Sequence, residues 1–91
     1  MTPLDGWLPG PNPFGNQRAQ INETWYRQTS RGVYEVRYDF QRRGFVINKE
    51  SVLQAATKIS PGNSTWTMFS PVVFADPLGA MVWFALEDNT L

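Results

Sequence analysis

The sequence has neither cysteine nor histidine among its 91 residues. Without cysteine it has no disulfide framework, no thiolate nucleophile and no zinc site built from thiolates. Without histidine it lacks the side chain that most often performs acid–base catalysis near neutral pH. We therefore predict a protein that is not an enzyme, with no catalytic residue, no metal and no cofactor.

Net charge and long apolar runs are missing as well. Eight Lys and Arg balance eight Asp and Glu, so no long-range field draws the chain toward phosphate. The longest apolar stretch, residues 80–86, falls far short of the roughly 20 residues of a membrane helix. The first residues lack the basic and apolar regions of a signal peptide. We expect no membrane partner, no secretion through a signal peptide, and a location in a virion or the cytoplasm.

The first 20 residues are instead dense in residues that break helices and strands, namely Pro3, Gly6, Pro9, Gly10, Pro11, Pro13 and Gly15. Proline favours a stiff, extended path. Apolar side chains stand between these breakers: Leu4, Trp7, Leu8 and Phe14. We predict an extended arm over residues 1–20 and a single small β-rich domain over residues 21–91. The arm packs either on its own sheet or on a neighbouring subunit.

Residues 33–40 alternate between apolar and polar side chains, which is typical of a half-buried strand. The pattern directs the aromatic face inward and leaves Glu35, Arg37 and Asp39 in solvent. The polar residues 41–44 then form a hairpin loop, with a return strand at 45–47. We interpret residues 21–29, which include Trp25, as another strand.

The second half of the chain changes period. Val52, Ala55 and Ile59 fall on one helical face, which predicts a short helix within residues 48–59 with Asn48 as its N-cap. A strand is the alternative, because residues 51–54 also alternate. Residues 65–74 read as strand material interrupted at Pro71. We expect residues 80–86 to form a strand that is apolar on both faces, followed by a loose tail over 87–91.

These elements predict a mainly β fold, a small antiparallel sheet or a barrel or sandwich, with one short α-helix and the N-terminal arm. One helix cannot cover both faces of a sheet that carries so many aromatic side chains, four Trp, three Tyr and six Phe in the whole chain. A second chain would supply the missing cover. We therefore expect a homo-oligomer, or permanent docking on a larger protein assembly such as a capsid.

The function that fits this description is that of a structural protein acting through protein–protein contacts. By analogy of architecture, we predict a virion component, either a capsid cement or decoration protein or a head–tail or tail accessory protein. The residues expected to bind a partner are Leu4, Trp7, Leu8, Phe14, Arg42, Arg43, Met81 and Trp83. The alternative is a small β-domain that binds single-stranded nucleic acid through residues 18–45, which hold all six arginines interleaved with aromatic residues. With no net charge, we regard nucleic acid as the less favoured partner.

Overall fold

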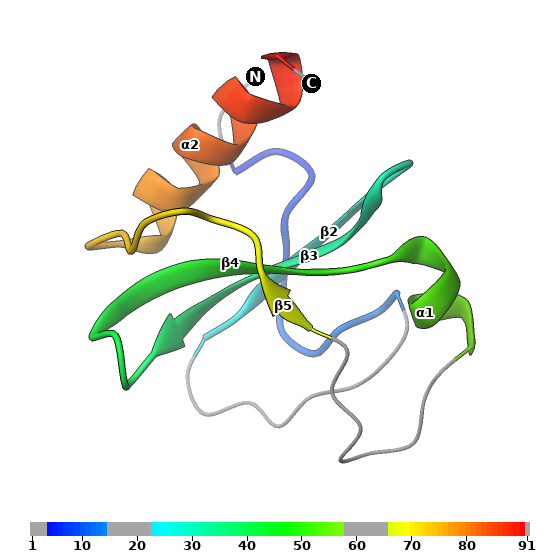
Figure 1. Ribbon diagram of the computed structural model, residues 1–91, viewed down its shortest axis with the longest axis horizontal. Coiled ribbons are helices and arrows are strands. Elements are labelled where there is room, and N and C mark those ends of the chain that lie inside the picture. The colour runs from blue at the N-terminus through cyan, green and yellow to red at the C-terminus, as the bar shows by residue number, and fades with distance from the viewer. Residues whose placement is uncertain (1–3, 15–22, 58–65, 91) are drawn as a thin grey trace.

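The computed structural model describes residues 4–14, 23–57 and 66–90. Five of its elements are strands, in chain order β1 (Leu8–Pro9), β2 (Trp25–Thr29), β3 (Gly32–Asp39), β4 (Gly44–Glu50) and β5 (Thr67–Met68). Two are helices, α1 (Val52–Thr57) and α2 (Pro77–Thr90). The strands form one antiparallel sheet in the order β1-β2-β3-β4-β5, so each strand pairs with its neighbours in sequence (Figure 1). The predicted mainly β fold class, with a short helix, is confirmed.

The meander β2-β3-β4 forms the centre of the sheet. Its register pairs Trp25 with Val36 and Val36 with Ile47. The predicted β3–β4 hairpin is present, with its turn at residues 40–43, one residue earlier than the predicted loop at 41–44. Gly44 begins β4 where the segment before α2 passes closely. A Cβ at Gly44 would overlap Val73 Cγ1 and lie 2.9 Å from the Phe74 carbonyl oxygen. A glycine is therefore required at this point of the hairpin.

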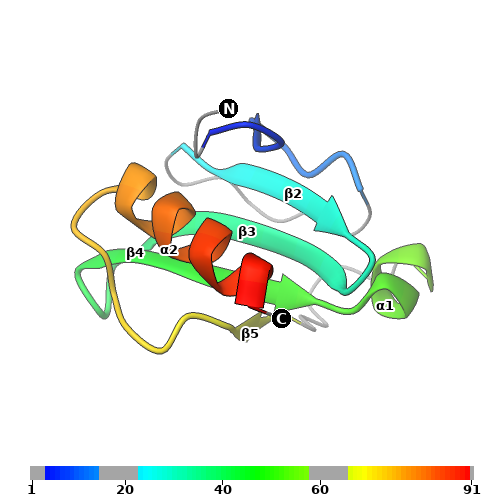
Figure 2. The same cartoon turned by 90° about the horizontal axis from the view of Figure 1, so that it is seen from above.

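One face of the sheet packs against α2. Because side chains alternate along a strand, Tyr34 and Val36 of β3 share this face with Ile47 of β4. Figure 2 shows α2 lying across β3 and β4. The buried core between the two layers is Trp7, Tyr34, Val36, Ile47, Ala80, Met81 and Phe84. Two cations lie against its rings, Arg27 with its guanidinium 5.3 Å from the centre of Phe84 and Lys49 with its Nζ 5.7 Å from the centre of Tyr34.

The predicted strand at residues 80–86 is wrong, since this segment lies inside α2. The residues before it start a helix. Pro77 occupies the first helical position, where its missing N–H costs nothing, and the Gly79 N–H donates to Asp76 Oδ1 at 2.6 Å. This side-chain cap satisfies a backbone donor that the helix itself cannot. The helix continues to Thr90, so the loose tail predicted after Leu86 is wrong for residues 87–90, while Leu91 lies outside the described residues.

The predicted solvated face of β3 is also wrong for Glu35 and Arg37, whereas Asp39 at the end of the strand is partly exposed. Glu35 is 0% exposed and Arg37 only 9% exposed, and both side chains lie on the face of the sheet that points away from α2. The α1 helix contacts β3, and the rings of Tyr26 and Trp66 meet edge to face at 6.1 Å. Conversely, Phe40, which the alternation places inside, is 55% exposed. Both faces of β3 are therefore covered by other parts of this chain.

The segments between β4 and α2 agree in outline with the predictions made from the sequence. The helix expected within residues 48–59 begins only at Val52, because Asn48 and Glu50 belong to β4, so Asn48 is not its N-cap. Residues 58 and 59 lie outside the described residues. The strand material expected at 65–74 is interrupted near Pro71, as predicted: β5 covers Thr67–Met68, and Phe74 forms a separate two-way backbone bridge with Phe45.

The predicted arm over residues 1–20 is described only from residue 4 to residue 14. Within that range Leu8 and Pro9 pair with β2, and the Gly10 N–H donates to the Thr24 carbonyl oxygen at 3.0 Å. Trp7 is buried against α2. This part of the segment therefore packs on its own domain, whereas an arm extended over residues 1–20 stays a prediction.

Candidate interaction surfaces

The residues predicted to bind a partner do not form one surface. Trp7 and Met81 are buried in the core of this chain, and the ring of Trp7 meets Phe84 at 5.3 Å. Their side chains already have contacts on all sides, so we withdraw these two as partner-binding candidates. Trp83 is half-buried, with its ring 5.8 Å from that of Phe69 and 5.9 Å from that of Phe74.

The other predicted residues reach solvent. Leu4 and Leu8 are exposed, whereas Phe14 is half-buried and donates its N–H to Asn12 Oδ1 at 2.9 Å. Arg42 and Arg43 are exposed together at the tip of the β3–β4 hairpin. These five residues remain available to a partner, and they come from two separate segments, residues 4–14 and the β3–β4 hairpin.

A surface that the sequence reading missed lies on α2. Leu78, Val82 and Leu86 are 48%, 40% and 64% exposed. Spaced four residues apart, they form one row along the helix, and they point away from Ala80 and Phe84, which face the sheet. We call Leu78, Val82 and Leu86 the outer row. The four-residue spacing and the Asp76–Pro77 helix start are both present in the sequence. The strand predicted over residues 80–86 instead places Val82 and Leu86 on the same face as Phe84, and leaves Leu78 outside the strand.

The hairpin tip carries a pair of opposite charges. Asp39 Oδ1 accepts the backbone N–H groups of Gln41 and Arg42, and its Oδ2 lies 2.7 Å from the Arg42 guanidinium. The Arg42 backbone N–H is the main reason that the pKa of Asp39 lies below its ordinary value. Arg42 is thus partly neutralised, and Arg43, which adopts a positive φ of 58°, is the more available of the two cations.

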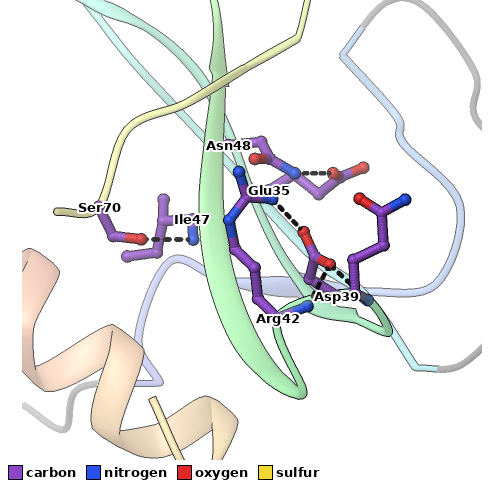
Figure 3. A network of polar contacts seen from close by, with 7 residues as sticks. Glu35, Asp39, Arg42, Ile47, Asn48 and Ser70 are labelled. Atoms are coloured by element: carbon purple, nitrogen blue, oxygen red, sulfur yellow. Dashed lines mark hydrogen bonds and ion pairs between the residues drawn. The ribbon is translucent and has the colours of Figure 1, made fainter. Parts of the chain in front are cut away.

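A buried polar network crosses the centre of the sheet. Glu35 Oε2 accepts the Tyr26 hydroxyl at 2.7 Å and lies 3.6 Å from the Arg37 guanidinium. Glu35 Oε1 accepts the Asn48 side-chain amide at 3.0 Å, a contact that Figure 3 shows. Burial, followed by the nearby Glu35 carboxylate, raises the pKa of Tyr26 well above its ordinary value of 10. With no exposed surface, Glu35 cannot touch a substrate. The network joins three strands and acts as a structural element.

A hollow opens at the end of the sheet where the β3–β4 hairpin closes. It measures about 580 Å³, and its described lining consists of Glu23, Trp25, Tyr38, Phe40, Phe45 and Pro77. We call it the aromatic hollow. Four of these residues are aromatic and one is an exposed carboxylate, and none is basic.

Comparisons with protein-family models, with curated proteins and with solved structures found no match for this chain. Within residues 4–14, 23–57 and 66–90, no helix has the length and apolar character needed to cross a membrane. In the same part of the chain, no three acidic side chains come close enough to hold a metal ion. The candidate interaction surfaces of the described residues are the outer row, the hairpin tip and the aromatic hollow.

Proposed function

We propose that this chain is a non-enzymatic structural protein that assembles with a second copy of itself through the outer row of α2. The observation that carries the proposal is the exposure of Leu78, Val82 and Leu86 on a helix whose opposite side is buried in the core. A helix that is apolar all round normally has partners all round. The sheet covers only one side of α2.

The charge pattern of α2 favours a second copy as the occupant. No charged residue occurs between Pro77 and Leu86, and the first is Glu87. When a helix packs on an identical helix across a two-fold axis, the same patch meets itself. Any charge within the row would then face its own copy. A row without charge can therefore pack on a copy of itself without repulsion. A strongly charged partner would find no opposite charge in the row to pair with.

The geometry of the row suits such a pairing. Side chains four residues apart form a ridge, and two such ridges interlock when helices cross at about −50° with axes about 8–10 Å apart. In an antiparallel pair Val82 lies near the two-fold axis and meets Val82 of the second copy, while Leu78 lies toward the other copy's Leu86. In such a dimer, Leu78, Val82 and Leu86 of each copy, which are exposed in the single chain, become buried against the other copy.

The size of the contact sets its strength. Three half-exposed aliphatic side chains offer an apolar patch on the order of a few hundred Å², whereas a stable complex buries about 800 Å² from each partner. Val72 and Val73, in the segment that leads into α2, are exposed as well. We expect a dimer that dissociates in the micromolar range.

The narrower role, a capsid or tail accessory component, remains part of this proposal. What supports it is the physical requirement that such components share: a small folded domain that offers more than one exposed contact surface. The outer row of α2 and the hairpin tip with Arg42 and Arg43 are two such surfaces. Exposed Leu4 and Leu8 on the N-terminal segment add a third.

A single cysteine tests the pairing directly, because the chain has none of its own. We expect the variant Val82→Cys to form a disulfide-linked dimer under mild oxidation, since residues that meet at a helix crossing come within the about 4.4–6.8 Å between Cα atoms that a disulfide needs. Leu53→Cys is the matched control, because Leu53 is an exposed leucine on α1, away from the outer row.

The readout is the rate of dimer formation on a non-reducing gel, normalised to the rate at which each thiol reacts with a soluble thiol reagent. The proposal predicts much faster cross-linking for the cysteine at position 82 than for the one at position 53. Equal normalised rates would mean that the outer row does not face a second copy.

A further inference from the structure

We propose that the aromatic hollow is a binding site for an organic ammonium group, such as the trimethylammonium head of a small alkyl cation. This inference concerns a different part of the molecule from the outer row and does not depend on assembly. It rests on the kind of side chains that line the hollow, the angles between their rings and the charges around them.

The sheet gathers the lining residues at one end. Tyr38 and Phe45 are paired across β3 and β4, and Trp25 begins β2 on the same face. Phe40 belongs to the hairpin turn, and Pro77 is the first residue of α2. The hollow therefore forms where α2 begins and no longer covers the sheet, which leaves aromatic rings of the α2-facing side open to solvent.

The rings stand at large angles to one another. Tyr38 and Phe40 have ring centres 4.9 Å apart with planes inclined at 76°, and Tyr38 and Phe45 have centres 5.5 Å apart with planes at 78°. At these angles the edge of one ring meets the face of its neighbour, so the three rings form one cluster, and the ring surfaces that no neighbour covers line the hollow. The face of an aromatic ring carries partial negative charge and attracts a cation placed over it. Several ring faces around one space are the arrangement that recognises quaternary ammonium groups.

The charges near the hollow select a cation over an anion. Glu23 contributes an exposed carboxylate to the lining. Three arginines lie within two residues of the lining residues Tyr38, Phe40 and Phe45 in the sequence. Arg37 points to the opposite face of the sheet, 3.6 Å from Glu35. Arg42 is paired with Asp39 at 2.7 Å, and Arg43 is exposed on the turn. None of them is among the described lining residues. A phosphate in the hollow would meet ring faces and Glu23, both of which repel it.

The size of the hollow agrees with a small-molecule ligand. Its volume of about 580 Å³ lies within the about 300–1,000 Å³ of ordinary ligand sites. A trimethylammonium head is much smaller than this, so the remaining space can hold the chain that carries it. We therefore assign the ligand class as an alkylammonium compound.

The test compares choline with 3,3-dimethyl-1-butanol, which has the same shape but no charge. Titration of the ¹⁵N-labelled full chain, followed by amide chemical shifts, detects binding as weak as millimolar. We expect choline to saturate the shifts of Trp25, Tyr38 and Phe45 with an affinity about ten-fold higher than that of the neutral compound. The shift changes should be confined to this end of the sheet.

Two variants locate the binding. Phe40→Ala removes an exposed ring and should leave the fold intact, yet lower choline affinity about five-fold. Glu23→Gln keeps the shape of the rim and should lower it about two- to three-fold. Leu53→Ala, an exposed residue on α1, is the control that should bind choline like the parent chain. Circular dichroism confirms that each variant is folded.

Three results would overturn the proposal. Equal affinity for choline and the neutral compound would make the hollow an apolar cleft without cation preference. The absence of saturable shifts would leave it without an ammonium ligand. Binding of a single-stranded oligonucleotide at the same amides, lost on the double change Arg42→Glu and Arg43→Glu, would assign the hollow to nucleic acid instead. None of these outcomes affects cross-linking at position 82, so this proposal and the assembly proposal can fail separately.

Discussion

At the scale of single residues, the least predictable feature is the buried carboxylate of Glu35. The alternation of residues 33–40 correctly predicts the strand, and charge alone then suggests that Glu35 and Arg37 face water. Burial is tolerated because Tyr26 and Asn48 both donate to Glu35. These partners come from two neighbouring strands and are set by the pairing register. No pattern local to β3 contains that information.

Because Tyr26 donates a buried hydrogen bond to Glu35, we predict that the chain becomes less stable at alkaline pH. Tyr26→Phe should lower the free energy of unfolding at neutral pH by about 1–3 kcal/mol, because a buried carboxylate oxygen loses its donor. Since folding raises the pKa of Tyr26, the folded chain keeps a proton that the unfolded chain releases from about pH 10 upward. The stability of the parent chain therefore falls as the pH rises above that value.

Urea unfolding at a series of pH values from neutral to about 11 measures this effect. The difference in stability between the parent chain and Tyr26→Phe should shrink as the pH rises past the ordinary pKa of tyrosine. A difference that stays constant over the whole range would contradict the raised pKa of Tyr26 and its attributed cause.

At the scale of secondary structure, the strands of the meander were predicted and α2 was missed. Residues 80–86 are apolar on every side, so periodicity does not distinguish a strand from a helix. The deciding signals lie just before this segment, where Asp76 and Pro77 form a helix start that resembles a turn when read alone. This error also hides the outer row, because only in a helix do Phe84 and the outer row point to opposite sides.

Two residues on opposite sides of α2 test this assignment. Phe84→Ala removes a ring that packs on Trp7 and Tyr34 and should lower the free energy of unfolding by about 3–5 kcal/mol. Leu86→Ala changes an exposed side chain and should alter the stability of the monomer by less than about 0.5 kcal/mol. Thermal or urea unfolding at low protein concentration gives both values. Similar losses for the two variants would contradict the two-sided role of α2.

At the scale of the whole molecule, the sequence predicts the fold class but overstates the need for a second chain. The aromatic residues appear short of cover only while residues 80–86 count as another strand. As a helix this segment is itself the cover for one face of the sheet (Figure 2). The expected contact with another copy then shifts from the core residue Met81 to the outer row, which has no partner within the described residues.

The solution mass of the unmodified chain tests whether the outer row joins two copies, with no substitution needed. Light scattering after gel filtration gives this mass across a dilution series from about 1 µM to about 500 µM. We predict a mass that rises with concentration from the 10.4 kDa of the monomer toward twice that value. A mass that stays at 10.4 kDa throughout the series would contradict this pairing.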